Sequence, residues 1–154
     1  MSVLEKLMKV ATRAARHEFG NEGSCGMPKW LIEDEHGHRI LIATPFEKTP
    51  DYKDIVANSM RQMLKEFGAV AYVLAVESWF ISHKLDDPRR DLPPSQCADR
   101  QEGVFICGED IHGNSQSILM EIKRDGDNAT LGKAQVTESS IGRFVDMFSV
   151  GPYL

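Results

Sequence analysis

The chain has 154 residues, of which 42% are hydrophobic and 27% are charged, and its formal net charge is -5 at pH 7. This length and composition predict one ordinary globular domain spanning residues 1–154 and argue against wholesale disorder. The acidic balance argues against a nucleic-acid partner, because that affinity comes largely from clustered Lys and Arg. No apolar run reaches the roughly 20 residues of a membrane-spanning helix, and the N-terminus has no secretory signal core. We therefore expect a cytoplasmic protein with no membrane partner.

The first segment predicts an amphipathic helix over residues 3–18. Ser2 and Glu5 have the Ser-x-x-Glu spacing of a capping box, in which each side chain bonds the other's backbone. Apolar residues then recur at helical spacing, and Gly20 is the expected C-terminal stop.

Residues 29–33 and 38–43 are two short runs rich in β-forming residues, and the segment between them contains Gly37. This pattern predicts a β-hairpin, because glycine suits a turn position of positive φ. Thr49 and Pro50 then have the form of a helix N-cap followed by proline at the first helical position. An apolar stripe predicts a helix that continues to a stop at Gly68.

The longest apolar run of the chain covers residues 69–83. Its β-branched and aromatic content favours a strand that is covered on both faces at its start and less covered towards its end. A charged, proline-rich segment follows over residues 85–102, and its composition predicts a long exposed loop or a lid.

The remaining third of the chain predicts a second hairpin from residues 104–108 and 115–123, and a weaker strand over residues 133–137. Ser139 or Ser140 is the expected cap of a short last helix. Four apolar residues at helical spacing form the stripe of this helix and the candidate interface for self-association: Ile141, Phe144, Val145 and Phe148.

These elements predict an α+β fold with a mostly antiparallel sheet of five or six strands, built from two hairpins and a long central strand. An N-terminal helix, a central helix and a short C-terminal helix accompany the sheet. In the order of its elements, the chain resembles small α/β domains of the roadblock and longin type, which pair sheets or helices with partners. The resemblance concerns element order alone, because no motif of those families is present.

Glu77 is the main candidate for a ligand or partner contact, because a carboxylate in an otherwise apolar strand must reach solvent, find a partner or be neutral. The half-solvated end of an antiparallel strand favours solvent. His83 shares its strand face but lies about 20 Å away at strand rise, too far for direct contact. Four charged residues of the 85–102 loop complete the candidate set: Asp86, Asp87, Arg89 and Arg90.

Neither a metal nor a cofactor is expected. His36 and His38 stand near one turn, but the spacing of a closed metal site is missing. Cys97 and Cys107 could act as nucleophiles beside a base, although Cys107 lies in an apolar run and reads as a core residue. No phosphate-binding, dinucleotide-binding or nucleophile-elbow motif is present.

Two functional hypotheses remain. The first is a small interaction or assembly module that forms a homo-oligomer or binds another protein, since the chain combines an ordinary core with no catalytic motif. The second is a small enzyme whose site is assembled around Glu77, His83 and the 85–102 loop, because catalytic groups need only converge in space.

Overall fold

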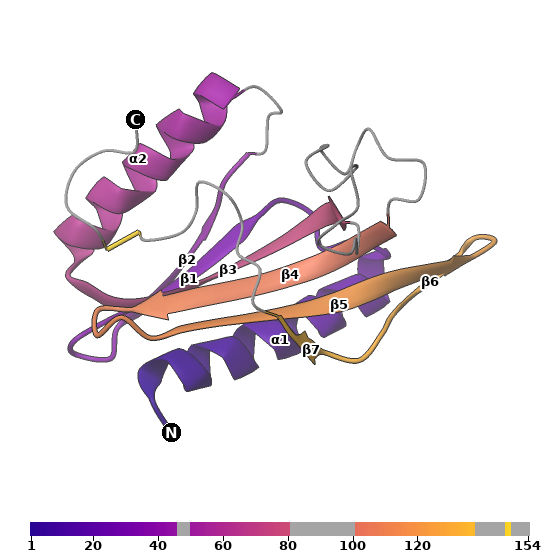
Figure 1. Cartoon of the computed structure of the whole chain (residues 1–154), viewed down its shortest axis with the longest axis horizontal. Helices are drawn as coiled ribbons and strands as arrows, with labels where there is room; N and C mark the ends of the chain where they lie inside the picture. The colour runs from indigo at the N-terminus through magenta and orange to yellow at the C-terminus, as the bar shows by residue number, and fades with distance from the viewer. Residues whose placement is uncertain (46–49, 81–100, 138–146, 149–154) are drawn as a thin grey trace, which may run out of the picture.

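The computed structural model describes residues 1–45, 50–80, 101–137 and 147–148, which form two helices and one antiparallel sheet (Figure 1). The α+β class is therefore confirmed. The helices are α1 (Val3–Glu22) and α2 (Pro50–Phe67). The strands are β1 (Lys29–Asp34), β2 (Arg39–Ala43), β3 (Ala69–Phe80), β4 (Gln101–Asp110), β5 (Ser115–Asp125), β6 (Asn128–Leu131) and β7 (Gln135–Val136).

The strands lie in the order β2-β1-β3-β4-β5-β6. The short strand β7 lies off this path and pairs with β5 at Ile118 and Leu119, whereas β6 pairs with residues 122–125 of β5. Two hairpins, β1–β2 and β4–β5, thus flank the long central strand β3, as expected from the sequence. The expected count of five or six strands was wrong, because the described residues hold seven. The missed strand is β6, whose four residues offer only two apolar side chains to a periodicity argument.

Helix α1 begins at the predicted cap, where the Ser2 hydroxyl accepts a hydrogen bond from the Glu5 amide over 3.1 Å. It continues through Gly20, which we expected to end it, and stops only at Gly23. Gly23 adopts a φ of 69°, and its amide donates to the Phe19 carbonyl over 2.8 Å. Gly23 therefore supplies the left-handed cap, for which glycine has the lowest cost.

The two helices cover opposite faces of the sheet (Figure 1). The α1 face buries side chains of β3, β4 and β5, whereas the α2 face buries side chains of β1 and β3. Strand β3 contributes to both, because Ala71 and Val73 point to α1 while Tyr72 and Leu74 point to α2. This confirms the predicted two-sided burial at the start of the strand.

The turns of the two main hairpins are built alike. Asp34 accepts hydrogen bonds from the amides of His36 and His38, and Asp110 accepts them from the amides of His112 and Asn114. The second carboxylate oxygen of each aspartate bonds a side chain, from His38 and from Asn114 respectively. Both turns have the sequence pattern Glu-Asp-x-His-Gly, and the glycine of each turn has positive φ. The turns therefore share one hydrogen-bonding scheme.

Some expectations about the second half of the chain need correction. Gln101 and Glu102 belong to β4 and not to the preceding loop, because they pair with the end of β3. The described residues contain no C-terminal helix: Met147 and Phe148 form a turn, and residues 138–146 lie outside the description. The Phe148 ring lies 5.5 Å from the Tyr72 ring, so this residue packs on its own sheet. Ile141, Phe144 and Val145 lie outside the described residues.

Candidate functional site

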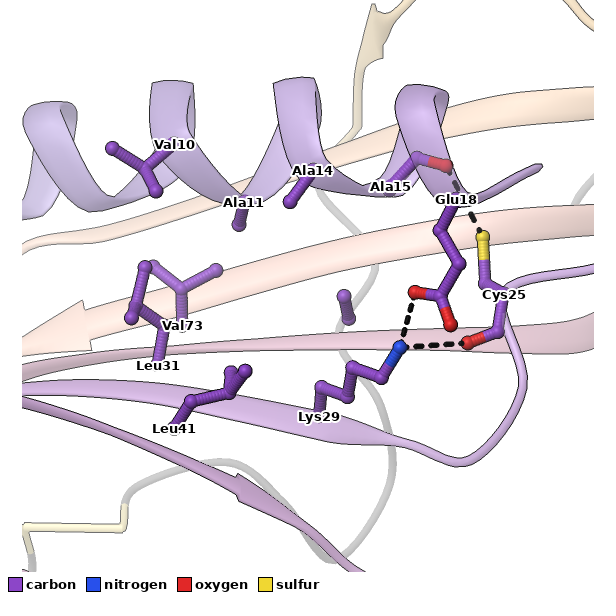
Figure 2. Close-up of a pocket in the computed structure, with 11 residues that line it drawn as sticks. Val10, Ala11, Ala14, Ala15, Glu18, Cys25, Lys29, Leu31, Leu41 and Val73 are labelled. Carbon is purple, nitrogen blue, oxygen red and sulfur yellow. Dashed lines mark hydrogen bonds and ion pairs between the residues drawn. The ribbon is translucent and has the colours of Figure 1, made fainter. Parts of the chain in front are cut away.

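A cavity of about 210 Å³ lies between α1 and the sheet (Figure 2). On the helix side it is lined by Val10, Ala11, Ala14 and Ala15, and on the sheet side by Leu31, Leu41, Val73 and Ala75. Glu18, Cys25 and Lys29 gather at one end, so the cavity is apolar along its length and polar only there.

The cavity exists because α1 covers only part of its face of the sheet. On this face, Lys29 and Leu31 of β1 are left half-buried, and Leu41 of β2 is exposed. Small side chains at Ala14 and Ala75 leave further room between the helix and the strands. One helix is about 10 Å wide, whereas neighbouring strands are about 4.8 Å apart, so a single helix cannot cover a sheet this broad.

The polar end is an ion pair between Lys29 and Glu18, two side chains that are each about one-third exposed. The Lys29 ammonium also lies 3.4 Å from the Cys25 carbonyl oxygen, to which it donates. Lys29 thus joins the start of β1 to the last turns of α1 and to the connection between them. Figure 2 shows these contacts as dashed lines at the end of the cavity.

Glu77 lies on the same face of β3 as Ala71 and Val73, which is the α1 side of the sheet. Its carboxylate accepts a hydrogen bond from the Cys25 amide over 2.6 Å, and its side chain is half-buried. We expected Glu77 to face solvent at a strand end, but the structure gives it a backbone partner. The bond ties the segment after α1 to the central strand, across 52 residues of sequence.

The Cys25 thiol is buried and points back to α1, where it lies 3.6 Å from the Ala15 carbonyl oxygen. Burial raises the pKa of this thiol from 9.0 to about 12, and the Glu77 and Glu18 carboxylates add to the effect while Lys29 opposes it. The thiolate is the reactive form of cysteine. Cys25 therefore works as a packing and hydrogen-bonding residue at neutral pH.

Alkylation tests this state of Cys25. In the folded protein we expect iodoacetamide at pH 8 to leave Cys25 unmodified under conditions that label it fully in urea-unfolded protein, as read by mass spectrometry of peptides. Rapid labelling of Cys25 in folded protein at pH 8 would contradict the assignment.

The raised pKa of Cys25 in the folded protein also links stability to pH. The contribution of the protonated thiol to stability is fully present below pH 9.0 and is lost as the pH rises towards about 12.

The other residues singled out in the sequence do not converge with Glu77 in the described part. His83, Asp86, Asp87, Arg89 and Arg90 lie outside the described residues. His36 and His38 are exposed at the tip of the first hairpin, and the described residues contain no group of three or more His, Cys, Asp or Glu side chains able to hold a metal.

Cys107 is buried on β4, as expected for a core residue, and its thiol lies 3.1 Å from the Ser117 hydroxyl. Burial raises the pKa of this thiol as well, and the hydrogen bond with Ser117 offsets part of that rise. Cys107 is therefore held in its protonated form at neutral pH.

Sequence reasoning missed Glu18, Cys25 and Lys29. These residues come from the end of a helix, a turn-rich connection and the start of a strand, and no motif links them. The one available signal was the set of alanines on one face of α1, which indicates a helix that approaches its sheet closely.

Known proteins give no further guide to this site. No family model, curated protein or solved structure matches the chain. The resemblance to roadblock and longin domains therefore remains one of element order. Neither α1 nor α2 is long and apolar enough to cross a membrane, within the described ranges.

Proposed function

We propose that the protein is a small interaction module that self-associates through strand β2, forming a homodimer with one continuous sheet. The observation that carries this proposal is that β2 is an exposed edge strand. It ends the sheet, it pairs only with β1 among the described strands, and its Leu41 side chain is 64% exposed. An exposed edge strand presents a row of backbone donors and acceptors to another chain.

The hydrogen-bond alternation shows which backbone groups of β2 face outward. The Thr44 amide donates to Pro28 and the Asp34 amide donates to His38, so the even-numbered residues of β2 bond inward to β1. The N–H and C=O groups of Arg39, Leu41 and Ala43 therefore point away from β1.

A two-fold axis through Leu41 would align two copies of β2 antiparallel. Leu41 would then face its own counterpart, and Arg39 would face Ala43 of the other copy, which is the self-complementary contact of a symmetric dimer. The strand carries little protection against such pairing. Its one charged side chain, Arg39, already pairs with Glu33 of β1, and it contains no proline.

The substitution Leu41→Pro tests this edge. Proline removes an N–H that points outward and leaves the β1–β2 bonds intact, so we expect it to convert a dimer into a monomer that keeps its fold. Light scattering over a concentration series and circular dichroism measure the two properties together.

Two variants serve as controls. Leu41→Thr keeps the backbone donor and β propensity and should retain the dimer. Ile111→Thr removes another exposed apolar side chain, in the β4–β5 turn, and should have no effect on assembly. A wild-type protein that is monomeric up to about 1 mM contradicts the proposal. So does a Leu41→Pro variant that remains dimeric.

A further inference from the structure

We propose that the cavity between α1 and the sheet binds a small uncharged amphiphile, an aliphatic chain that ends in a hydroxyl or primary amide group. This binding site goes beyond self-association, which concerns the backbone edge of β2. The apolar part of the ligand lies along the α1 and β3 walls, and its polar end reaches Glu18 and Lys29.

The walls favour an apolar occupant over water. Val10 and Ala14 of the helix face Leu31 and Val73 of the sheet, and none of these side chains offers a hydrogen bond. A water molecule needs two to four polar partners to be well held. Water along these walls is therefore poorly bound, and its release favours the entry of an apolar chain.

The volume sets the size of the ligand. An apolar cavity of ~150 Å³ accommodates benzene, which has six non-hydrogen atoms. By the same ratio, the 210 Å³ cavity accommodates about eight non-hydrogen atoms. A straight chain such as 1-heptanol has this size, whereas a long-chain fatty acid does not fit.

The polar end selects a neutral head group. A lysine ammonium has three N–H donors, and Lys29 directs two of them to Glu18 and the Cys25 carbonyl. A hydroxyl or amide group can accept the third and donate to the Glu18 carboxylate. A carboxylate would instead meet the negative charge of Glu18, and an ammonium group would meet the positive charge of Lys29.

The direct test is a titration of the full-length protein with 1-heptanol, followed by methyl resonances in NMR. We expect saturable shifts at Val10, Leu31 and Val73, and weaker binding of heptanoate and heptylamine by about threefold or more. The absence of saturable shifts at these methyl groups overturns the proposal.

A cavity-filling variant locates the site. Ala75→Leu places a larger side chain inside the cavity, so it should weaken heptanol binding at least about tenfold while the melting temperature stays the same or rises. Ala134→Leu, at an exposed position outside this cavity, should bind as the wild type does. Ala14→Phe fills the same space from α1 and keeps the test decisive if Ala75→Leu fails to fold. Unchanged binding in a folded cavity-filling variant overturns the proposal.

Two charge variants test the placement of the head group. Glu18→Gln leaves the Lys29 charge uncompensated, so heptanoate should gain about threefold relative to heptanol. Lys29→Met leaves the Glu18 charge uncompensated, so heptylamine should gain by a similar factor. Preferences that stay fixed in both variants overturn the assignment of the head group to this end. Dimer formation is measured separately, so failure here is distinguishable from failure of the β2 contact.

Discussion

Replacing Gly108 by alanine is expected to lower the free energy of unfolding by about 3 kcal/mol, because this position has no room for a methyl group. A Cβ atom there would lie 2.7 Å from Leu4 Cδ1, 2.8 Å from the Tyr72 carbonyl oxygen and 2.8 Å from Val73 Cγ2. The carbonyl oxygen belongs to the central strand and cannot rotate away. Relief therefore requires α1 or β4 to move.

Gly132 provides a matched control for this substitution. A Cβ atom at Gly132 would approach nothing closer than the Glu121 carbonyl oxygen at 3.5 Å, which is ordinary van der Waals contact. Urea unfolding of the two alanine variants should therefore separate them clearly. Equal stability of Gly108→Ala and Gly132→Ala would show that α1 does not rest on β4 as closely as described.

Replacing both turn aspartates, Asp34 and Asp110, by alanine is expected to cost about 4 kcal/mol, about 2 kcal/mol at each turn. Each carboxylate accepts three hydrogen bonds, including two from backbone amides. Strand β3 separates the two turns, at about 9.6 Å for two strand spacings, so the losses should nearly add. Thermal and urea unfolding of the single and double variants measure each loss of stability and show whether the two losses add. The exposed Asp127, in the β5–β6 turn, is the control.

The same aspartates predict acid sensitivity. Burial tends to raise the pKa of each, but hydrogen bonds from His38 and His36 to Asp34, and from Asn114 and His112 to Asp110, outweigh it and hold both pKa values below 3.8. The stability they contribute is therefore present above pH 3.8 and is lost as the pH falls through the folded pKa values. The double variant should show a weaker dependence of stability on pH in this acid range. An unchanged dependence would contradict the assignment.

Local signals in the sequence identified most of the fold. The Ser2 cap, the proline at position 50 and the glycines at positions 37 and 68 mark boundaries by their own backbone chemistry, and each boundary is where the structure has it. The start of β3 followed from its run of apolar residues. Such signals need no knowledge of the rest of the chain.

The misses have physical reasons. Gly20 and Gly23 both suit a helix end, and the left-handed φ of 69° at Gly23, with its amide bonded to the Phe19 carbonyl, distinguishes them. The four residues of β6 form a strand because β5 extends far enough to pair with them. The conformation of this segment is therefore set by its pairing with β5 and not by its own β propensity.

The candidate site was the least predictable part. The Cys25–Glu77 bond joins residues that share no pattern, and the cavity reflects space that side chains leave unfilled. That space depends on which strands α1 covers, which is a property of the packed sheet. The sequence could single out Glu77 as unusual, but it could not name its partner.

Helix α1 is fastened at both ends: near its start Leu4 rests on Gly108, and beyond its end Cys25 is bonded to Glu77. These contacts oppose an outward swing of the helix that would admit a molecule. In the monomer, the route into the cavity beside it is therefore lateral, past the exposed side chain of Leu41, which the proposed β2 dimer would place beside its own counterpart. Rotation of an exposed side chain takes picoseconds to nanoseconds, whereas collective shifts of helices take microseconds to milliseconds. An occupant of the monomer would therefore exchange with solvent quickly, whereas pairing of two copies through β2 would restrict the rotation of Leu41 and slow this exchange.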